Sequence, residues 1–235
     1  MFLSGTLLNA ATVLAGGLLG TALGAKLPAQ LRRNVVRGLG LFTLVLGVRG
    51  ALETQNVIVL LFATLVGGLA GAALSLDARL NALGDTLQRR FGRRGGRVSE
   101  AFVTTSIVFC VGPLTFLGAI QNGLSGDVRL LAIKSVLDGF AALAFAATLG
   151  WGVLLSVGTI LIYQGGLAAG ASVFASALTD PMLKEMSAAG GLLIVGVGLR
   201  LLELKDLQVA DFLPAIVVAP LIVTFLAALG IPWTP

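Results

Sequence analysis

The sequence predicts an all-α fold, a polytopic transmembrane helix bundle of about 8 spans that forms a single integral membrane domain over residues 1–235. Three observations support this fold class. Hydrophobic residues make up 57% of the chain, charged residues make up 11% and the mean hydropathy is +0.99, whereas a soluble domain has roughly 25% charged residues. Long apolar runs that contain Gly and Pro favour spanning helices over a barrel. The chain also carries an internal repeat.

Apolar segments and the charges between them define the expected spans. Before the centre of the chain these are residues 3–23, 35–52, 57–76 and 101–120. After it they are residues 127–149, 153–178, 190–202 and 212–229. The Gly112-Pro113 pair is expected to bend the fourth span because Pro removes a backbone hydrogen bond. We expect Thr179, Asp180 and Pro181 to end the sixth span, and Trp151 to anchor a short connection at the membrane interface.

Residues 77–97 form the most basic connection of the chain. Leucine and phenylalanine recur at helical spacing within it, at Leu76, Leu80, Leu83, Leu87 and Phe91. Its arginines are Arg79, Arg89, Arg90, Arg93, Arg94 and Arg97. The pattern predicts an amphipathic helix on the cytoplasmic surface, or a solvated basic linker that sets orientation. Since short basic connections stay in the cytoplasm, both termini are expected on the outer side of the membrane.

Composition also limits the function. The net charge of +5 is concentrated beside the spans, so we expect the lipid bilayer as partner and no nucleic acid. The chain has no histidine and one cysteine, Cys110, so the commonest transition-metal ligand and general base is absent and an intrachain disulfide is impossible. We expect no metal site, no cofactor, no catalytic residues and no enzyme activity.

The central stretch from Gly118 to Asp138 is unusually polar for this chain. Read as a helix that begins after Gly126, it has Asp127 as its N-cap and places Lys134 and Asp138 on one face at i and i+4. At 1.5 Å per residue, Asp138 would lie roughly 16 Å beyond the cap, near the middle of a hydrocarbon layer about 30 Å thick. Ionisable groups at that depth usually face a bundle interior or a wet cavity.

Six side chains of this stretch are therefore candidates for a solute or ion path. They are Gln121, Asn122, Asp127, Lys134, Ser135 and Asp138. Two alternatives stay open. The span could begin near Leu137 and leave Lys134 at the interface, or Lys134 and Asp138 could form a buried pair with a purely structural role.

The sequence also resembles itself. The segment Gly5-Thr-Leu-Leu-Asn9-Ala-Ala-Thr12 matches Gly152-Val-Leu-Leu-Ser156-Val-Gly-Thr159, and each is soon followed by Gly-Gly-Leu. Further on, four residues of the second span match four of the seventh at one constant offset: Gly40 with Gly191, Leu41 with Leu192, Gly47 with Gly198 and Arg49 with Arg200. Spans 1–3 would thus repeat as spans 6–8 in opposite orientation around a central span 4–5 pair, a plan typical of secondary transporters.

The repeat supplies four secondary candidates. Asn9 and Ser156 are equivalent polar residues inside spans, where the ordinary role of such residues is interhelical hydrogen bonding. Arg49 and Arg200 lie near span ends, where snorkelling anchors paired with Glu53 and Glu203 are the ordinary interpretation. Most glycines are expected to form faces of small residues for close helix packing.

Four segments together resemble the YqgA/YdfK-type bacterial membrane proteins, the "domain of unknown function" family numbered 554. They are NAATVLAGGLLGTALG at the start, GLGLFTLVLGVRGALETQN, the central GAIQNGLSGDVRLLAIKSVLD and AAGGLLIVGVGLR near the end. The central segment meets the family pattern at Gly118, Ala119, Gly123, Gly126, Asp127, Leu131, Lys134, Ser135, Leu137 and Asp138. The resemblance covers essentially the whole chain. It implies a polytopic inner-membrane protein and brings no established activity.

The leading functional hypothesis is a small secondary transporter or facilitator of a small solute or ion. An oligomeric ion channel, formed by copies of this chain, and a non-transporting scaffold or sensor are the alternatives. A lysine and a helix start favour anionic groups, whereas two carboxylates favour cations. The mixed charges favour a small organic solute with a carboxylate over a divalent metal, which would meet too few oxygens beside an ammonium.

Overall fold

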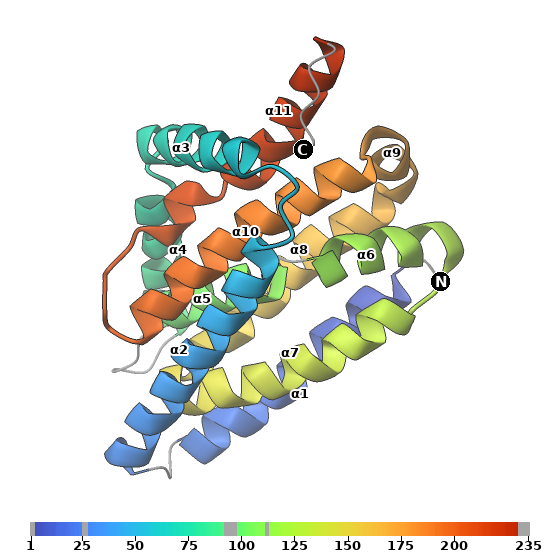
Figure 1. The fold of residues 1–235 in the computed structure, drawn as a ribbon. Helices are drawn as coiled ribbons and strands as arrows, with labels where there is room; N and C mark the ends of the chain where they lie inside the picture. The colour runs from blue at the N-terminus through green and yellow to red at the C-terminus, as the bar shows by residue number, and fades with distance from the viewer. Residues whose placement is uncertain (1–2, 25–27, 92–97, 111–112, 230–235) are drawn as a thin grey trace. The chain divides into compact units, whose positions relative to one another are not determined.

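A computed structural model describes residues 3–24, 28–91, 98–110 and 113–229, and every regular element in this part of the chain is helical. The elements are α1 Ser4–Gly24, α2 Ala29–Ala51, α3 Val57–Ala73, α4 Leu76–Phe91, α5 Val98–Cys110, α6 Pro113–Ser125, α7 Arg129–Leu149, η1 Trp151–Leu155, α8 Ser156–Ala169, α9 Ala171–Ala177, α10 Asp180–Leu201, η2 Val209–Phe212 and α11 Ala215–Ala228 (Figure 1). Six segments are long and apolar enough to cross a membrane, and two bent helix pairs raise the number to eight. The predicted all-α membrane fold is confirmed.

The two bent pairs are the expected third and fourth spans. The third span continues from α3 into the start of α4 through a bend of 53°, where Ser75 adopts a left-handed backbone with φ 51°. The fourth consists of α5 and α6, which meet at 61°. Pro113 begins α6, and Gly112 lies outside the described residues. The expected helix in the basic connection is present as α4, although most of its arginine side chains are not among those described.

Two predicted boundaries are wrong. Helix α10 begins at Asp180 and not near residue 190, because Pro181 fits the first turn of a helix, where a backbone N–H has no intrahelical acceptor. An acidic residue at the helix start is also favourable for the helix dipole. The predicted sixth span over residues 153–178 is not one helix. It starts as the 3-10 turn η1, continues as α8 and is interrupted at Gly170 before α9.

The chain divides into two compact units. Unit 1 comprises residues 1–39, 80–110 and 114–175, and unit 2 comprises residues 40–79, 111–113 and 176–235. In unit 1, α1 and α7 lie side by side (Figure 1) and run parallel, since Gly5 lies against Leu131 and Gly24 lies against Ala147. Helix α8 runs antiparallel to α1, because Thr6 contacts Gln164 near one end and Gly17 contacts Leu154 near the other.

Helices α1 and α7 approach through backbone-to-backbone contacts at glycine. A Cβ atom at Gly16 would overlap the carbonyl oxygen of Gly139, and one at Gly20 would overlap the carbonyl oxygen of Leu143. Polar residues of α1 are buried on this inner face, whereas Leu19 is 58% exposed on the opposite face. A membrane helix is expected to expose apolar side chains to lipid and to pack through small residues, so α1 has the distribution of a spanning helix.

Unit 2 is built on two antiparallel helix pairs. The first pairs α3 with η2 and α11, with Gly67 against Ala215 and Gly71 against the backbone of Asp211. The second pairs residues 40–51 of α2 with α10 through glycines on both helices. The buried core of unit 2 consists of Leu60, Ala63, Ala188, Ala189, Ala215 and Ala219. Small residues therefore form the close helix contacts inside each of the two units.

Substitution of Gly20 by Ala is expected to destabilise the protein, because the added methyl group overlaps a backbone carbonyl that cannot move independently of α7. Overpacking of this kind costs about 1 to 3 kcal/mol. Gly166→Ala is the matched control, since a Cβ at Gly166 in α8 meets nothing within 4 Å and Ala favours a helix. Thermal unfolding in detergent measures both. Equal melting temperatures for the two variants would contradict the packing described for α1 and α7.

Candidate functional site

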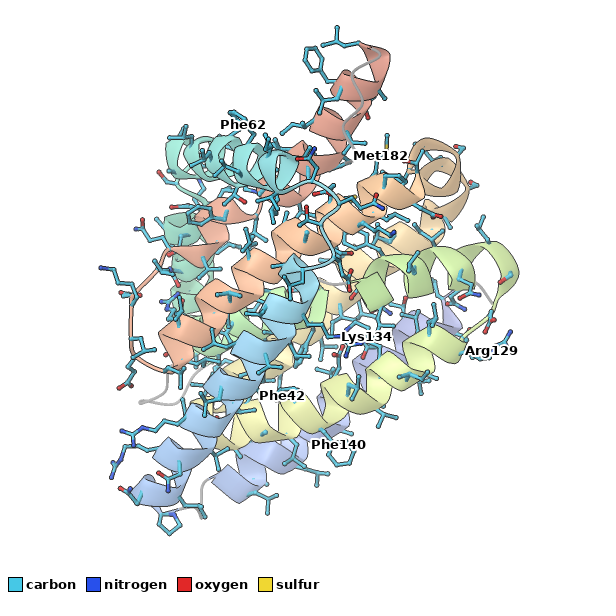
Figure 2. The ribbon with its side chains drawn as sticks, viewed as in Figure 1. Phe42, Phe62, Arg129, Lys134, Phe140 and Met182 are labelled. Atoms are coloured by element: carbon cyan, nitrogen blue, oxygen red, sulfur yellow. The ribbon has the colours of Figure 1, made fainter. Side chains whose placement is uncertain are left out.

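A buried ion pair occupies the interior of unit 1. Lys134 and Asp138, at i and i+4 on α7, are 5% and 8% exposed, and the Lys134 ammonium donates to Oδ2 of Asp138. At 1.5 Å per residue, Asp138 lies about 13.5 Å along α7 from Arg129, near the middle of the span. Figure 2 shows Lys134 and Phe140 on opposite sides of α7, and Phe140 is 72% exposed. The charged side chains thus face protein and an aromatic ring faces outward.

Side chains from two other helices complete the site. From α1, Nδ2 of Asn9 donates to Oδ2 of Asp138 at 3.0 Å and to Oε1 of Gln164 in α8 at 3.0 Å. Nε2 of Gln164 then donates to the hydroxyl of Thr6 at 3.3 Å. All three side chains are 0 to 1% exposed. We call Thr6, Asn9, Lys134, Asp138 and Gln164 the polar cluster. It joins α1 to α7 and α8, whose cluster residues Asp138 and Gln164 lie 129 and 155 residues after Asn9.

The start of α7 sets the position of the ion pair along this helix. Gly126 has φ 72°, a left-handed conformation that favours glycine, and it turns the chain from α6 towards α7. The helix begins at Arg129 with Val128 as its N-cap, so the prediction of Asp127 as N-cap is wrong by one residue. The side chain of Asp127 still accepts from the backbone N–H of Arg129 at 2.9 Å. The helix therefore begins before Lys134, and whether the membrane span begins there or near Leu137 stays a prediction.

Asp127 lies outside the polar cluster. The guanidinium of Arg129 donates hydrogen bonds to its carboxylate, with an N–O distance of 2.7 Å for the closest pair. These bonds, the backbone N–H of Arg129 and its charge hold the pKa of the Asp127 carboxyl below the usual value. The Asp127 carboxylate therefore remains charged at neutral pH, just before the start of α7.

The other candidates in the central stretch make hydrogen bonds outside the polar cluster. Ser135 is buried and donates to the carbonyl oxygen of Leu131. Asn122 is buried at the end of α6, where its Oδ1 accepts from the backbone N–H of Gly5 at 3.1 Å. Gln121 is exposed and its amide lies 3.5 Å from Asp127. The structure thus brings Lys134 and Asp138 together. The side chains of Gln121, Asn122, Asp127 and Ser135 make other contacts and are not part of the polar cluster.

The secondary candidates separate in the same way. Asn9 joins the polar cluster, whereas the hydroxyl of Ser156 donates to the carbonyl oxygen of Val153 in its own turn. Arg200 forms its ion pair with Asp206 at 3.4 Å, and not with the expected Glu203. Arg49 is exposed at the end of α2. Partial burial raises the pKa of the nearby Glu53, and the charges of Arg49 and Lys184 oppose this shift.

Sequence reasoning missed several buried polar residues, and three of them, Thr6, Gln164 and Glu185, bond to groups that are distant in the chain. Thr6 and Gln164 are polar residues inside apolar spans, the same signal that identified Asn9. The third, Glu185, lies in α10 of unit 2 and is 0% exposed. Its carboxylate accepts from the hydroxyl of Thr54 at 2.8 Å and from the backbone N–H of Gln55 at 2.6 Å, so it fixes the loop before α3. The late predicted start of this span had left Glu185 outside the membrane.

The polar cluster offers both signs of charge to a ligand. A carboxylate can bind a proton or a cation, and an ammonium can bind an anion, while amides on α1 and α8 can donate and accept hydrogen bonds. Oδ1 of Asn9 is buried and has no hydrogen-bond partner among the described atoms. Within those same residues, no group of three or more His, Cys, Asp and Glu side chains could hold a metal ion. The interactions that the cluster itself makes are one ion pair and hydrogen bonds.

Comparison with known proteins places these residues in a family. The family described as "Protein of unknown function (DUF554)" matches residues 4–224. The chain belongs to this family. The matched range includes every residue of the polar cluster.

Two relatives in the family align with nearly the whole chain. "Uncharacterized protein YqgA" of Escherichia coli (strain K12) is 33% identical over 220 residues, which cover 92% of this chain and 94% of the relative. "Uncharacterized membrane protein YdfK" of Bacillus subtilis (strain 168) is 25% identical over 231 residues, 97% of this chain and 98% of the relative. No solved structure matches the chain. The family assignment supports a membrane protein and assigns no activity.

The ion pair predicts an asymmetry between single and double substitutions. Asp138→Ala or Lys134→Ala leaves one buried charge without its partner, which costs about 3 to 5 kcal/mol. The double substitution Lys134→Ala with Asp138→Ala removes both charges, so we expect it to be less destabilising than either single change. Unfolding in detergent with increasing dodecyl sulfate measures the three variants. Additive losses in the double variant would show that the two groups do not interact.

Proposed function

We propose that the protein is a small secondary transporter, in which the polar cluster binds a small solute or ion on its way across the membrane. The observation that carries the proposal is the buried Lys134–Asp138 pair, which lies midway along a spanning helix and is contacted by Asn9 from a second helix. An intramembrane charge costs roughly 2.5 to 3.5 kcal/mol on insertion scales, and such groups usually mark a pathway. The proposed role is binding and movement, without a catalytic step.

Packing in unit 2 supports the transporter proposal independently. Gly40 lies against Leu202, and the equivalent position Gly191 lies against Ala51. Gly47 lies against Val195, and its equivalent Gly198 lies against Leu44. At the constant offset of the repeat, Leu202 corresponds to Ala51 and Val195 corresponds to Leu44. Each contact therefore has an equivalent contact in which the roles of α2 and α10 are exchanged.

Such reciprocal contacts are expected where two antiparallel helices cross about a local two-fold axis. They favour an inverted repeat that relates spans 1–3 to spans 6–8. Inverted repeats are common in secondary transporters, where they allow two symmetry-related conformations that open the binding site to opposite sides.

Helix directions within the units fit an even number of crossings, such as eight. Spans one and five, α1 and α7, run parallel, whereas three other pairs run antiparallel: α1 with α8, α2 with α10, and α3 with α11. Alternating crossings require parallel directions for spans separated by an even number and antiparallel directions for an odd number. The observed directions fit this rule if both bent pairs count as spans, which gives eight crossings, and also if neither does, which gives six. We propose a bacterial inner membrane location with both termini outside, since basic connections favour the cytoplasm.

We favour a small organic solute that carries a carboxylate. The Lys134 ammonium would form its counter-charge, and the amides of the cluster would orient it. The Asp138 carboxylate would remain free to bind a proton or a cation when the solute takes its place beside Lys134.

Flux measurements test the role of Asp138. Proteoliposomes that contain the wild-type protein should take up one or more radiolabelled amino acids or short carboxylates. Asp138→Asn should reduce that flux by about tenfold or more, a factor that corresponds to roughly 1.4 kcal/mol. Asp206→Asn is the control, because Asp206 is 90% exposed and far along the chain from the cluster. Equal flux in both variants would remove Asp138 from the mechanism.

Membrane topology is tested by accessibility labelling in a Cys110→Ala background. Single cysteines replace Thr86 in α4, Asp180 at the start of α10 and Asp206 after α10, all of which are exposed. Eight crossings place positions 86 and 206 in the cytoplasm and position 180 outside. Labelling of positions 86 and 180 from the same side would contradict the eight-span topology.

A further inference from the structure

The orientation of the Asn9 amide is determined by its neighbours. Its Nδ2 lies 3.0 Å from a carboxylate oxygen of Asp138 and 3.0 Å from Oε1 of Gln164. If the amide were rotated by 180°, its oxygen would face an ionised carboxylate, and two acceptors would meet without a hydrogen. With Asp138 ionised, Nδ2 must therefore face Asp138, and Oδ1 is left without a partner in a fully buried position. A buried polar atom without a partner costs about 1 to 3 kcal/mol.

Protonation of Asp138 would remove the reason for this orientation. A protonated carboxyl group gains an O–H donor, and an amide oxygen of Asn9 could accept from it. Gln164 could rotate as well, so that its Nε2 donates to Asn9 and its Oε1 accepts from the hydroxyl of Thr6. The chain Asp138–Asn9–Gln164–Thr6 can thus exist with its donors and acceptors reversed, with the oxygen and nitrogen of each amide exchanging places.

Few charged or titratable groups compete at this position. On α7 itself Lys134 faces Asp138, and from α5 the thiol of Cys110 interacts electrostatically with both Lys134 and Asp138. Tyr163 of α8 lies close enough to Cys110 for an electrostatic interaction. Helices α1 and α6 and the turn η1, which also pack against α7, contain no titratable side chain, and Glu100 lies ten residues from Cys110 at the other end of α5. Asp138 is therefore the carboxyl of this cluster.

We propose that Asp138 is a proton-binding site and that its occupancy reverses the hydrogen-bond chain from α7 through α1 to α8. An incoming proton forms an O–H bond with a carboxylate oxygen of Asp138, which becomes a neutral carboxylic acid. The Lys134 ammonium, released from its counter-ion, then becomes available to an anionic group. The inference rests on the proposed transport function in naming the proton as the coupled ion. Asn9 acts as a positioning residue that reports the state of Asp138 to Gln164.

Infrared difference spectroscopy on acidification tests the site in full-length protein reconstituted in liposomes. A carboxylic acid C=O band is expected to appear in the wild type within the pH range where the protein stays folded. Because the other Asp and Glu residues also contribute acid bands, the Asp138 component is the part of this band that should disappear in Asp138→Asn and stay in the exposed control Asp206→Asn. Side-chain amide bands should change with the same midpoint, and Gln164→Leu should remove part of that change.

Two further variants keep the proposal falsifiable if Asp138→Asn fails to fold. Asn9→Leu retains the carboxyl but removes its acceptor, so the band should shift in frequency. Lys134→Gln removes the neighbouring positive charge, and the midpoint should move to higher pH by about 1 to 3 units. A wild-type spectrum without the band, or a band that is unchanged in Asn9→Leu, would overturn the proposal. If the wild-type protein shows the infrared signal but no solute flux, that result would contradict the transporter proposal alone.

Discussion

The ion pair between Lys134 and Asp138 imposes the strictest condition on unit 1. Charges near the middle of a hydrocarbon layer are tolerated when they are paired, hydrogen-bonded and shielded from lipid. Helix α7 meets the first condition alone, through its i, i+4 spacing. The other two require neighbours, which α1 supplies by lying along the same face of α7 and contributing Asn9. The close approach of these helices is thus a requirement of the charge as well as of packing.

Glycine makes that approach possible. Lipid is as apolar as the protein interior, so membrane helices gain little from burying leucine and associate through close contact of small residues. Gly16, Gly20 and Gly24 bring the backbone of α1 against the backbone of α7 beyond the polar cluster. The inner half of this interface is therefore closely packed, while the half nearer the start of α1 holds the polar side chains. If the protein moves solute, this glycine contact is the part that must separate.

Unit 2 solves a similar problem with a different group. Glu185 is fully buried, and its partners are a hydroxyl and backbone N–H groups of the loop before α3. A carboxylate held by several donors in this way is stabilised without a cationic partner. Its role is that of a structural clamp on the loop, whereas Asp138 has a cation and an amide with an unpartnered oxygen.

The sequence by itself determined the membrane class, the number of candidate spans, the basic connection and the spacing of Lys134 and Asp138, because hydropathy, charge and helical period are local properties. Only the tertiary structure decided which residues surround the pair: Asn9 and Gln164 lie 129 and 155 residues from their partners in the chain. It also decided that Ser156 faces its own turn and that Glu185 lies inside a helix. The physical reason is that lipid-facing and buried surfaces are equally apolar in a membrane helix. Periodicity therefore does not mark the inner face, and helix packing alone selects it.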